Sequence, residues 1–242
     1  FNDVKVKGQI RPRYETADVK DNGVDAGKAF TARTSLVATA GLFEVENLTT
    51  TVGIISVNNF GSDQYNSSTN GKAQYDIIAD PQQAMISDAA LDYKVGKTAL
   101  HAGRSKVNID NQRFIGTVGW RQLERSYDTV YVADSSIENL SLLAAWVYGF
   151  QGVAKTPATT TQDTNSVLLH VNYKVMDELS VTAYDYMLAN LHDTMGIALT
   201  GNVNAGAKLD YRVEYATQGD ASMNIHGGAK AKADATYMNF DL

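Results

Sequence analysis

Cysteine is absent from the 242-residue sequence, so disulfides, thiolate catalysis and cysteine-ligated metal sites are excluded. Long apolar runs are absent as well, and no stretch reaches the about 18 residues that suggest a transmembrane helix. The longest strongly apolar stretch is Leu140–Phe150. Its length suits a single transmembrane β-strand, which needs about 9–11 residues. Phe1 opens directly into a strand pattern without a signal peptide, as expected of a mature chain, a trimmed chain or a protein that is never exported.

Basic character is also lacking, because the net charge is −6 and the isoelectric point about 5.2. This balance argues against nucleic acid as a partner. The sequence has no Gly-x-Ser-x-Gly elbow, no phosphate-binding Walker loop and no His-Glu-x-x-His pattern, and its carboxylates are scattered. We therefore expect no enzyme activity and no cofactor.

A weak candidate for a calcium site lies in the first long loop, where Asp18, Asp21 and Asp25 surround Gly23. Carboxylate oxygens are the ligands that Ca²⁺ prefers. The run lacks the spacing of an EF-hand, and Asn22-Gly23 is an ordinary turn signal. No metal site is therefore predicted.

Residues of alternating character fill the first segment of the chain. Apolar Val4, Val6, Ile10 and Tyr14 alternate with Lys5, Lys7, Gln9, Arg11, Arg13 and Glu15. Period-two alternation predicts a strand whose two faces meet different environments. The same pattern recurs, less regularly in places, and predicts about twelve strands and no long helix. The expected strands after the first are 28–40, 43–57, 84–94, 98–106, 126–133, 140–148, 166–174, 178–188, 194–201, 208–215 and 236–242.

The connections between these strands run mostly long, short, long, short: residues 16–27 and 58–83 are long, whereas 41–42 and 95–96 are tight. Transmembrane barrels have this asymmetry, with short periplasmic turns and long extracellular loops. Tyrosines and tryptophan near the expected strand ends fit the aromatic girdles of such barrels. The sequence thus predicts an all-β, antiparallel transmembrane barrel in the outer membrane. A soluble all-β carbohydrate-binding module is the alternative from another class.

The connection 107–125 is the most densely charged, and we expect it to fold into the space that the strands enclose. Polar groups at this density must face water, bind a charged partner or pair with one another. The predicted pore constriction consists of Arg104, Asp110, Arg113, Arg121 and Arg125, and the predicted lumen wall of Lys5, Lys7, Arg11, Arg13 and Arg212. Alternatively, the loop arginines pair with Asp110, Glu124 and Asp128 merely to fix the loop.

The segment 103–132 also resembles the alginate-export family of outer-membrane porins. The residues that carry the resemblance are Gly103-Arg104, the run from Asp110 to Gly116, Trp120-Arg121 and Tyr127-Asp128. The resemblance implies a monomeric barrel of eighteen strands with a loop folded into a charged pore. Twelve strands fall short of that number, so residues 1–242 are expected to be one barrel domain that is either the N-terminal portion of a longer barrel or a smaller closed one.

From these observations we expect a porin for passive diffusion of small hydrophilic solutes, which include anions. A narrower alternative is a dedicated exporter of an alginate-like polysaccharide. The expected partners are outer-membrane lipid and the solutes. Charges of both signs occur on the inward faces, as Glu15 and Asp210 illustrate, so the sequence does not fix the ion selectivity.

Overall fold

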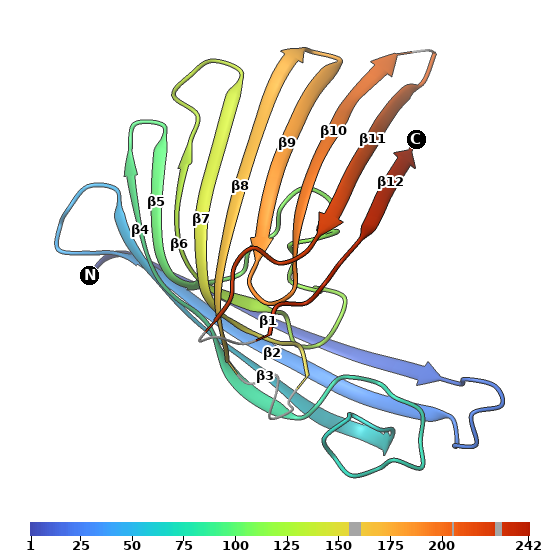
Figure 1. Ribbon diagram of the computed structural model, residues 1–242. Coiled ribbons are helices and arrows are strands. Elements are labelled where there is room, and N and C mark those ends of the chain that lie inside the picture. The colour runs from blue at the N-terminus through green and yellow to red at the C-terminus, as the bar shows by residue number, and fades with distance from the viewer. Residues whose placement is uncertain (155–160, 205, 226–228) are drawn as a thin grey trace. The chain divides into compact units, whose positions relative to one another are not determined.

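The computed structural model describes residues 1–154, 161–204, 206–225 and 229–242, and within them the regular structure is entirely β. The strands pair in chain order from β1 to β12 in one antiparallel sheet (Figure 1). They are β1 (Asn2–Ala17), β2 (Gly27–Gly41), β3 (Leu48–Gln64), β4 (Gln83–Val95), β5 (Thr98–Ser105), β6 (Ser126–Asp134), β7 (Leu140–Gln151), β8 (Gln162–Met176), β9 (Leu179–Leu188), β10 (His192–Asn204), β11 (Lys208–Gly219) and β12 (Ala235–Asp241). The predicted all-β antiparallel architecture is confirmed. Among the described residues the sheet does not close, because β1 and β12 do not pair with each other.

The third strand differs from its predicted range of 43–57. Phe43, Glu44 and Asn47 all have positive φ angles, so this segment forms a turn and the strand begins at Leu48. At its other end the strand continues to Gln64, which pairs with Lys28 of β2. Sequence reading assigned the polar residues from 58 onward to a loop, whereas pairing with β2 keeps them in the ladder.

The contacts of the chain group into two compact units. The first contains Phe1–Leu91, Gly103–Asp128 and Gly149–Gln162, and the second contains Asp92–Ala102, Thr129–Tyr148 and Asp163–Leu242. The expectation that residues 1–242 form one domain stays a prediction.

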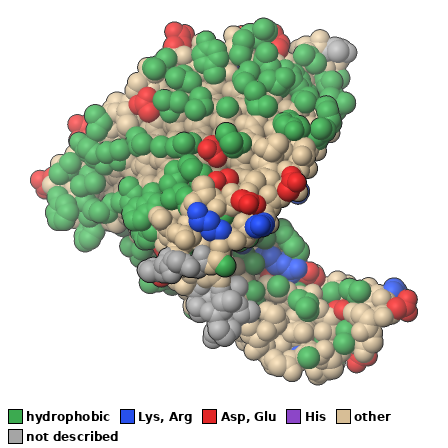
Figure 2. Space-filling view, viewed as in Figure 1, with side chains coloured by type: hydrophobic (Ala, Val, Ile, Leu, Met, Phe, Trp, Pro, Cys, Tyr) green, Lys and Arg blue, Asp and Glu red, His purple; other side chains and the backbone are tan. Residues whose placement is uncertain are grey.

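Each unit carries an exposed apolar sheet face. In the first unit the exposed apolar side chains on β1 and β3 include Val4, Val6, Ile10, Val52, Ile54 and Phe60. In the second unit they include Leu169, Val171, Met195, Ile197, Val213 and Tyr215. Figure 2 shows hydrophobic side chains gathered over the strands on the side in view. Apolar patches of this extent indicate a surface that meets something other than water. In the part of the chain that the structure describes, no helix has the length and apolarity to cross a bilayer.

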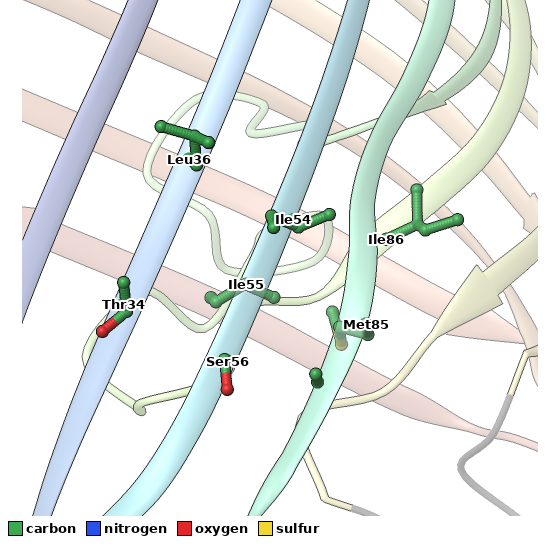
Figure 3. Close-up of a pocket in the computed structure, with 8 residues that line it drawn as sticks. Thr34, Leu36, Ile54, Ile55, Ser56, Met85 and Ile86 are labelled. Atoms are coloured by element: carbon green, nitrogen blue, oxygen red, sulfur yellow. The ribbon is translucent and has the colours of Figure 1, made fainter.

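An open groove of about 400 Å³ marks the apolar face of the first unit. Leu36 of β2, Ile54 of β3 and Ile86 of β4 contribute to its lining (Figure 3). All three side chains are about half exposed. The groove is thus part of the same apolar surface.

Candidate functional site

The opposite face of β1 and β2 concentrates positive charge in the first unit. Arg11 on β1 lies directly across from Arg33 on β2 in the strand register. Like charges in this position repel each other, and burial makes that repulsion stronger. Arg33 is only 5% exposed. This pair therefore needs counter-charges and acceptors, and the segment between β5 and β6 provides most of them.

Residues 106–125 connect β5 to β6 and are called the constriction loop below, after the role that the sequence predicts for them. The side chain of Arg11 holds this loop by several bonds. Its Nε donates to Oε1 of Gln122 at 3.1 Å, and its Nη1 donates to the carbonyl of Gly119 at 2.9 Å. Its Nη2 donates to the carbonyls of Trp120 and Arg121. The loop backbone is thus fixed against β1.

Glu124 of the constriction loop lies between two cations. One carboxylate oxygen lies 3.1 Å from Nη1 of Arg33, and the other lies 2.9 Å from Nζ of Lys106. Arg33 also donates from Nη2 to Oε1 of Gln9 at 2.6 Å. These contacts supply the counter-charge that the buried Arg33 requires.

A second set of ion pairs centres on Asp80, which precedes β4 and is 1% exposed. Its Oδ2 lies 3.7 Å from Nη1 of Arg13 and 3.9 Å from Nη1 of Arg121. Glu15 of β1 contacts the same two arginines, at 2.5 Å and 3.3 Å. The guanidinium carbon of Arg121 lies 3.9 Å from the ring centroid of Trp120, and that of Arg13 lies 5.0 Å from it, which are cation–π distances. Trp120 itself is 59% exposed.

Of the predicted constriction residues, Arg121 joins this cluster and the others lie elsewhere on the loop or beside it. Arg104 makes a bidentate pair with Asp128 at 2.7 and 2.8 Å, as in the loop-fixing alternative. Asp110 and Arg113 are exposed. The guanidinium of Arg125 lies 5.4 Å from the ring centroid of Phe150, and its buried Nε has no hydrogen-bond partner in the described residues.

The predicted lumen-wall residues divide in the same way. Arg11 and Arg13 belong to the cluster. Lys5 and Lys7 are exposed and follow the same alternation of β1. Arg212 lies in the second unit, where its Nε donates to Glu214 at 2.8 Å. Because Glu214 is 3% exposed, that arginine neutralises a buried carboxylate.

The calcium candidate is spread over different contacts. Asp18 pairs with Lys20 at 2.6 Å, and the backbone of Asp25 bridges to Tyr75. Asp21 has a φ of 60° in the turn between them. In residues 1–154, 161–204, 206–225 and 229–242, no group of three or more histidine, aspartate or glutamate side chains is placed to hold a metal ion.

Sequence reasoning missed Asp80 and Gln122. Both residues are buried, at 1% and 0% exposure. The backbone N–H of Gln122 donates to Oδ1 of Asp80 at 3.0 Å. Gln122 lies inside the segment that carried the family resemblance. For Asp80, the only available signal was a carboxylate followed by Pro81 and an apolar strand.

Solved structures with a similar fold include proteins of two bacterial species. OccAB2 of Acinetobacter baumannii matches with a TM-score of 0.74 and 15% identity over 98% of this chain and 62% of its own. OccAB4 of the same species gives 0.73 and 14% over 98% and 63%, and OccK8 (OprE) of Pseudomonas aeruginosa gives 0.72 and 14% over 98% and 63%. These are substrate-specific outer-membrane porins with barrels of 18 strands.

The sheet therefore has the fold of part of such a barrel. This chain spans about three fifths of the length of these neighbours. No family model and no curated protein matches the sequence.

The resemblance to the alginate-export family is wrong, because the structural neighbours are Occ and Opd porins. The residues that suggested it have local structural roles. Gly103 has a φ of 128° and lies so close to the backbone of Ala89 that a Cβ would clash with it. Arg104 forms an ion pair with Asp128, and Arg121 stacks on the ring of Trp120.

Acid should loosen the constriction loop. Burial raises the pKa of Glu124, but the bonds and charges of Lys106 and Arg33 outweigh it and hold this pKa below its ordinary value of 4.5. A depressed pKa means that the ionised carboxylate stabilises the loop above pH 4.5, and that this stabilisation is lost as the pH falls through the lowered pKa. We expect open-channel current noise to rise as the pH falls below 4.5.

The Glu124→Gln variant isolates the contribution of this one carboxylate. It should show raised noise already at neutral pH and a smaller change on acidification. Noise that is independent of pH in the unmodified protein would show that the Glu124 pairs do not hold the loop.

Proposed function

We propose that the chain builds an outer-membrane channel through which small hydrophilic solutes diffuse passively, with a preference for anions. The porin fold and the exposed apolar sheet faces support a barrel wall in lipid. The constriction loop on the charged face of β1 and β2 supports a narrowing of that channel. Diffusion down a gradient needs no catalytic group, so the proposal includes no enzyme activity.

The observation that carries the anion preference is the charge of the cluster on that face. Five cationic side chains and three carboxylates gather there, and four of the cations pair with a carboxylate, whereas Arg11 bonds Gln122 and backbone carbonyls. The cations are Arg11, Arg13, Arg33, Lys106 and Arg121, and the carboxylates are Glu15, Asp80 and Glu124. A narrow passage lined by an excess of one sign attracts solutes of the other sign.

Arg125 adds a further cation to the proposed path. Within the described residues its side chain has no ion pair with a carboxylate, and it rests on Phe150. An arginine without a fixed counter-charge can offer its forked donors to a passing carboxylate. Of the predicted constriction residues, Arg121 and Arg125 therefore have the strongest support, and Arg104, Asp110 and Arg113 stay predictions.

Liposome swelling with the full-length protein tests this function. Liposomes that carry the protein should swell faster in glucuronate than in glucose at equal osmolarity, because the two sugars are similar in size and differ in charge. Equal rates would contradict the anion preference. No swelling in either solute, from protein shown to be folded and inserted, would contradict the channel itself.

The soluble carbohydrate-binding alternative is not favoured, because a soluble domain rarely exposes apolar faces as extensive as those of β1, β3, β8 and β10. Outer-membrane lipid is the proposed partner of these faces. That the channel is a monomer stays a prediction.

A further inference from the structure

Gln122 and Leu123 form a two-residue dock near the C-terminal end of the constriction loop. Both side chains are fully buried, at 0% exposure. We propose that Gln122 is the positioning residue that holds the loop in its narrowing position, so that loss of its bonds widens the channel. This inference rests on the proposed channel function.

The side-chain amide of Gln122 acts as both a hydrogen-bond donor and a hydrogen-bond acceptor. Its Nε2 donates to Oγ1 of Thr31 at 2.9 Å, to the carbonyl of Thr31 at 3.2 Å and to the carbonyl of Arg11 at 3.3 Å. Its Oε1 accepts the 3.1 Å bond from Nε of Arg11. Its backbone N–H donates to Asp80. One residue thus links the loop to β1, to β2 and to the segment before β4.

Few other side chains fit this place. At this position the side chain must accept a hydrogen bond from Arg11 and donate N–H bonds to Thr31 and to the backbone of β1. A planar amide group has both an acceptor oxygen and a donor nitrogen. Glutamate has almost the same shape and keeps the acceptor, but when ionised it has no donors. The backbone carbonyls of Arg11 and Thr31 would then face a carboxylate that cannot donate to them.

Leu123 supplies the apolar half of the dock. It belongs to a buried cluster with Ile55 and Val57 of β3 and Met85 of β4. Ile55 and Met85 also line the apolar groove (Figure 3), and both side chains are buried, whereas Ile54 and Ile86 beside them are about half exposed. The loop is therefore held at successive residues by a polar and an apolar contact.

The position of the dock decides where the charged groups lie. Arg121 directly precedes the dock, and Glu124 directly follows it. Gln122 has no exposed surface with which to touch a solute, so it acts through these neighbours. If the dock opens, we expect Arg121 and Glu124 to lose their fixed positions, while the pairing of β1 with β2 stays intact.

Single-channel recordings from the full-length protein test the inference through two variants. Gln122→Ala removes all side-chain bonds of the dock, and Gln122→Glu removes only the donors. Both should raise the mean conductance and replace one steady open level by several. Gln112→Ala is the matched control, because Gln112 is exposed on the same loop and its substitution should leave the recording as in the unmodified protein.

Hydrogen exchange distinguishes a positioning role from general stability. The inference predicts faster exchange of loop amides 119–125 in both variants, with the amides of β1 and β2 unchanged. Unchanged conductance and unchanged loop exchange in both variants would overturn the inference while leaving the channel function intact. Faster exchange throughout the strands would also overturn it, because Gln122 would then be a residue for folding. If the unmodified protein forms no channel, that result contradicts the proposed function itself.

Discussion

Replacing Ile10 with arginine should destabilise the folded protein in lipid by about 2–4 kcal/mol, the cost measured for an arginine that faces the middle of a bilayer from a barrel. Ile10 lies near the middle of β1 and is 73% exposed on the apolar face. In water such an exposed apolar side chain could be replaced at little cost. In a bilayer the new charge must leave water or deform the membrane around it.

The matched control is Lys7→Arg, on the same strand but on the charged face. Three positions along a strand reverse the direction of the side chain, so this arginine replaces a cation that already faces the other environment. Reversible unfolding of the full-length protein in lipid vesicles, followed by tryptophan fluorescence in urea, gives both values. Equal stability of Ile10→Arg and the unmodified protein would contradict a lipid-facing role for the apolar face.

Replacing Arg13 and Arg121 together with alanine should shift the ion selectivity of the channel toward cations. The two substitutions remove both guanidinium groups that contact Asp80 and Glu15. The cluster would then contain as many carboxylates as cations, and its attraction for anions would disappear. The reversal potential in a salt gradient measures this shift directly.

A double variant of Lys20 and Lys72 controls for the loss of two positive charges. Each lysine lies in a loop and pairs with an aspartate, Asp18 and Asp63 respectively, and neither pair includes a residue of the cluster. Lys20→Ala with Lys72→Ala should leave the reversal potential close to that of the unmodified protein. A similar shift in both double variants would mean that total charge sets the selectivity.

The strands were predictable from sequence because alternation is a local signal. In β1 the residues from Val4 to Glu15 alternate without interruption, and the structure pairs the strand continuously from Lys5 to Ala17. The turn at residues 43–47 was missed because positive φ angles at Phe43 and Glu44 have no clear signature in those residue types. Strand number and order therefore followed from the pattern, whereas individual strand ends did not.

The contacts of the site were less predictable because they join distant parts of the chain. Gln122 bonds Arg11 across 111 positions and Asp80 across 42. The charge density of residues 103–132 indicated a special loop, but it did not show which arginines would have buried counter-charges. For Arg104 the sequence left two interpretations open, a place in the pore constriction or an ion pair that fixes the loop. The structure shows an ion pair with Asp128.

The central claim is that this chain builds a channel that the constriction loop narrows and makes positive. Single-channel current across a planar bilayer, recorded with the full-length protein in a salt gradient, tests it most directly. We predict steady current steps with a reversal potential on the anion-selective side. Current steps with a cation-selective reversal potential, or no steps from folded and inserted protein, would contradict the claim.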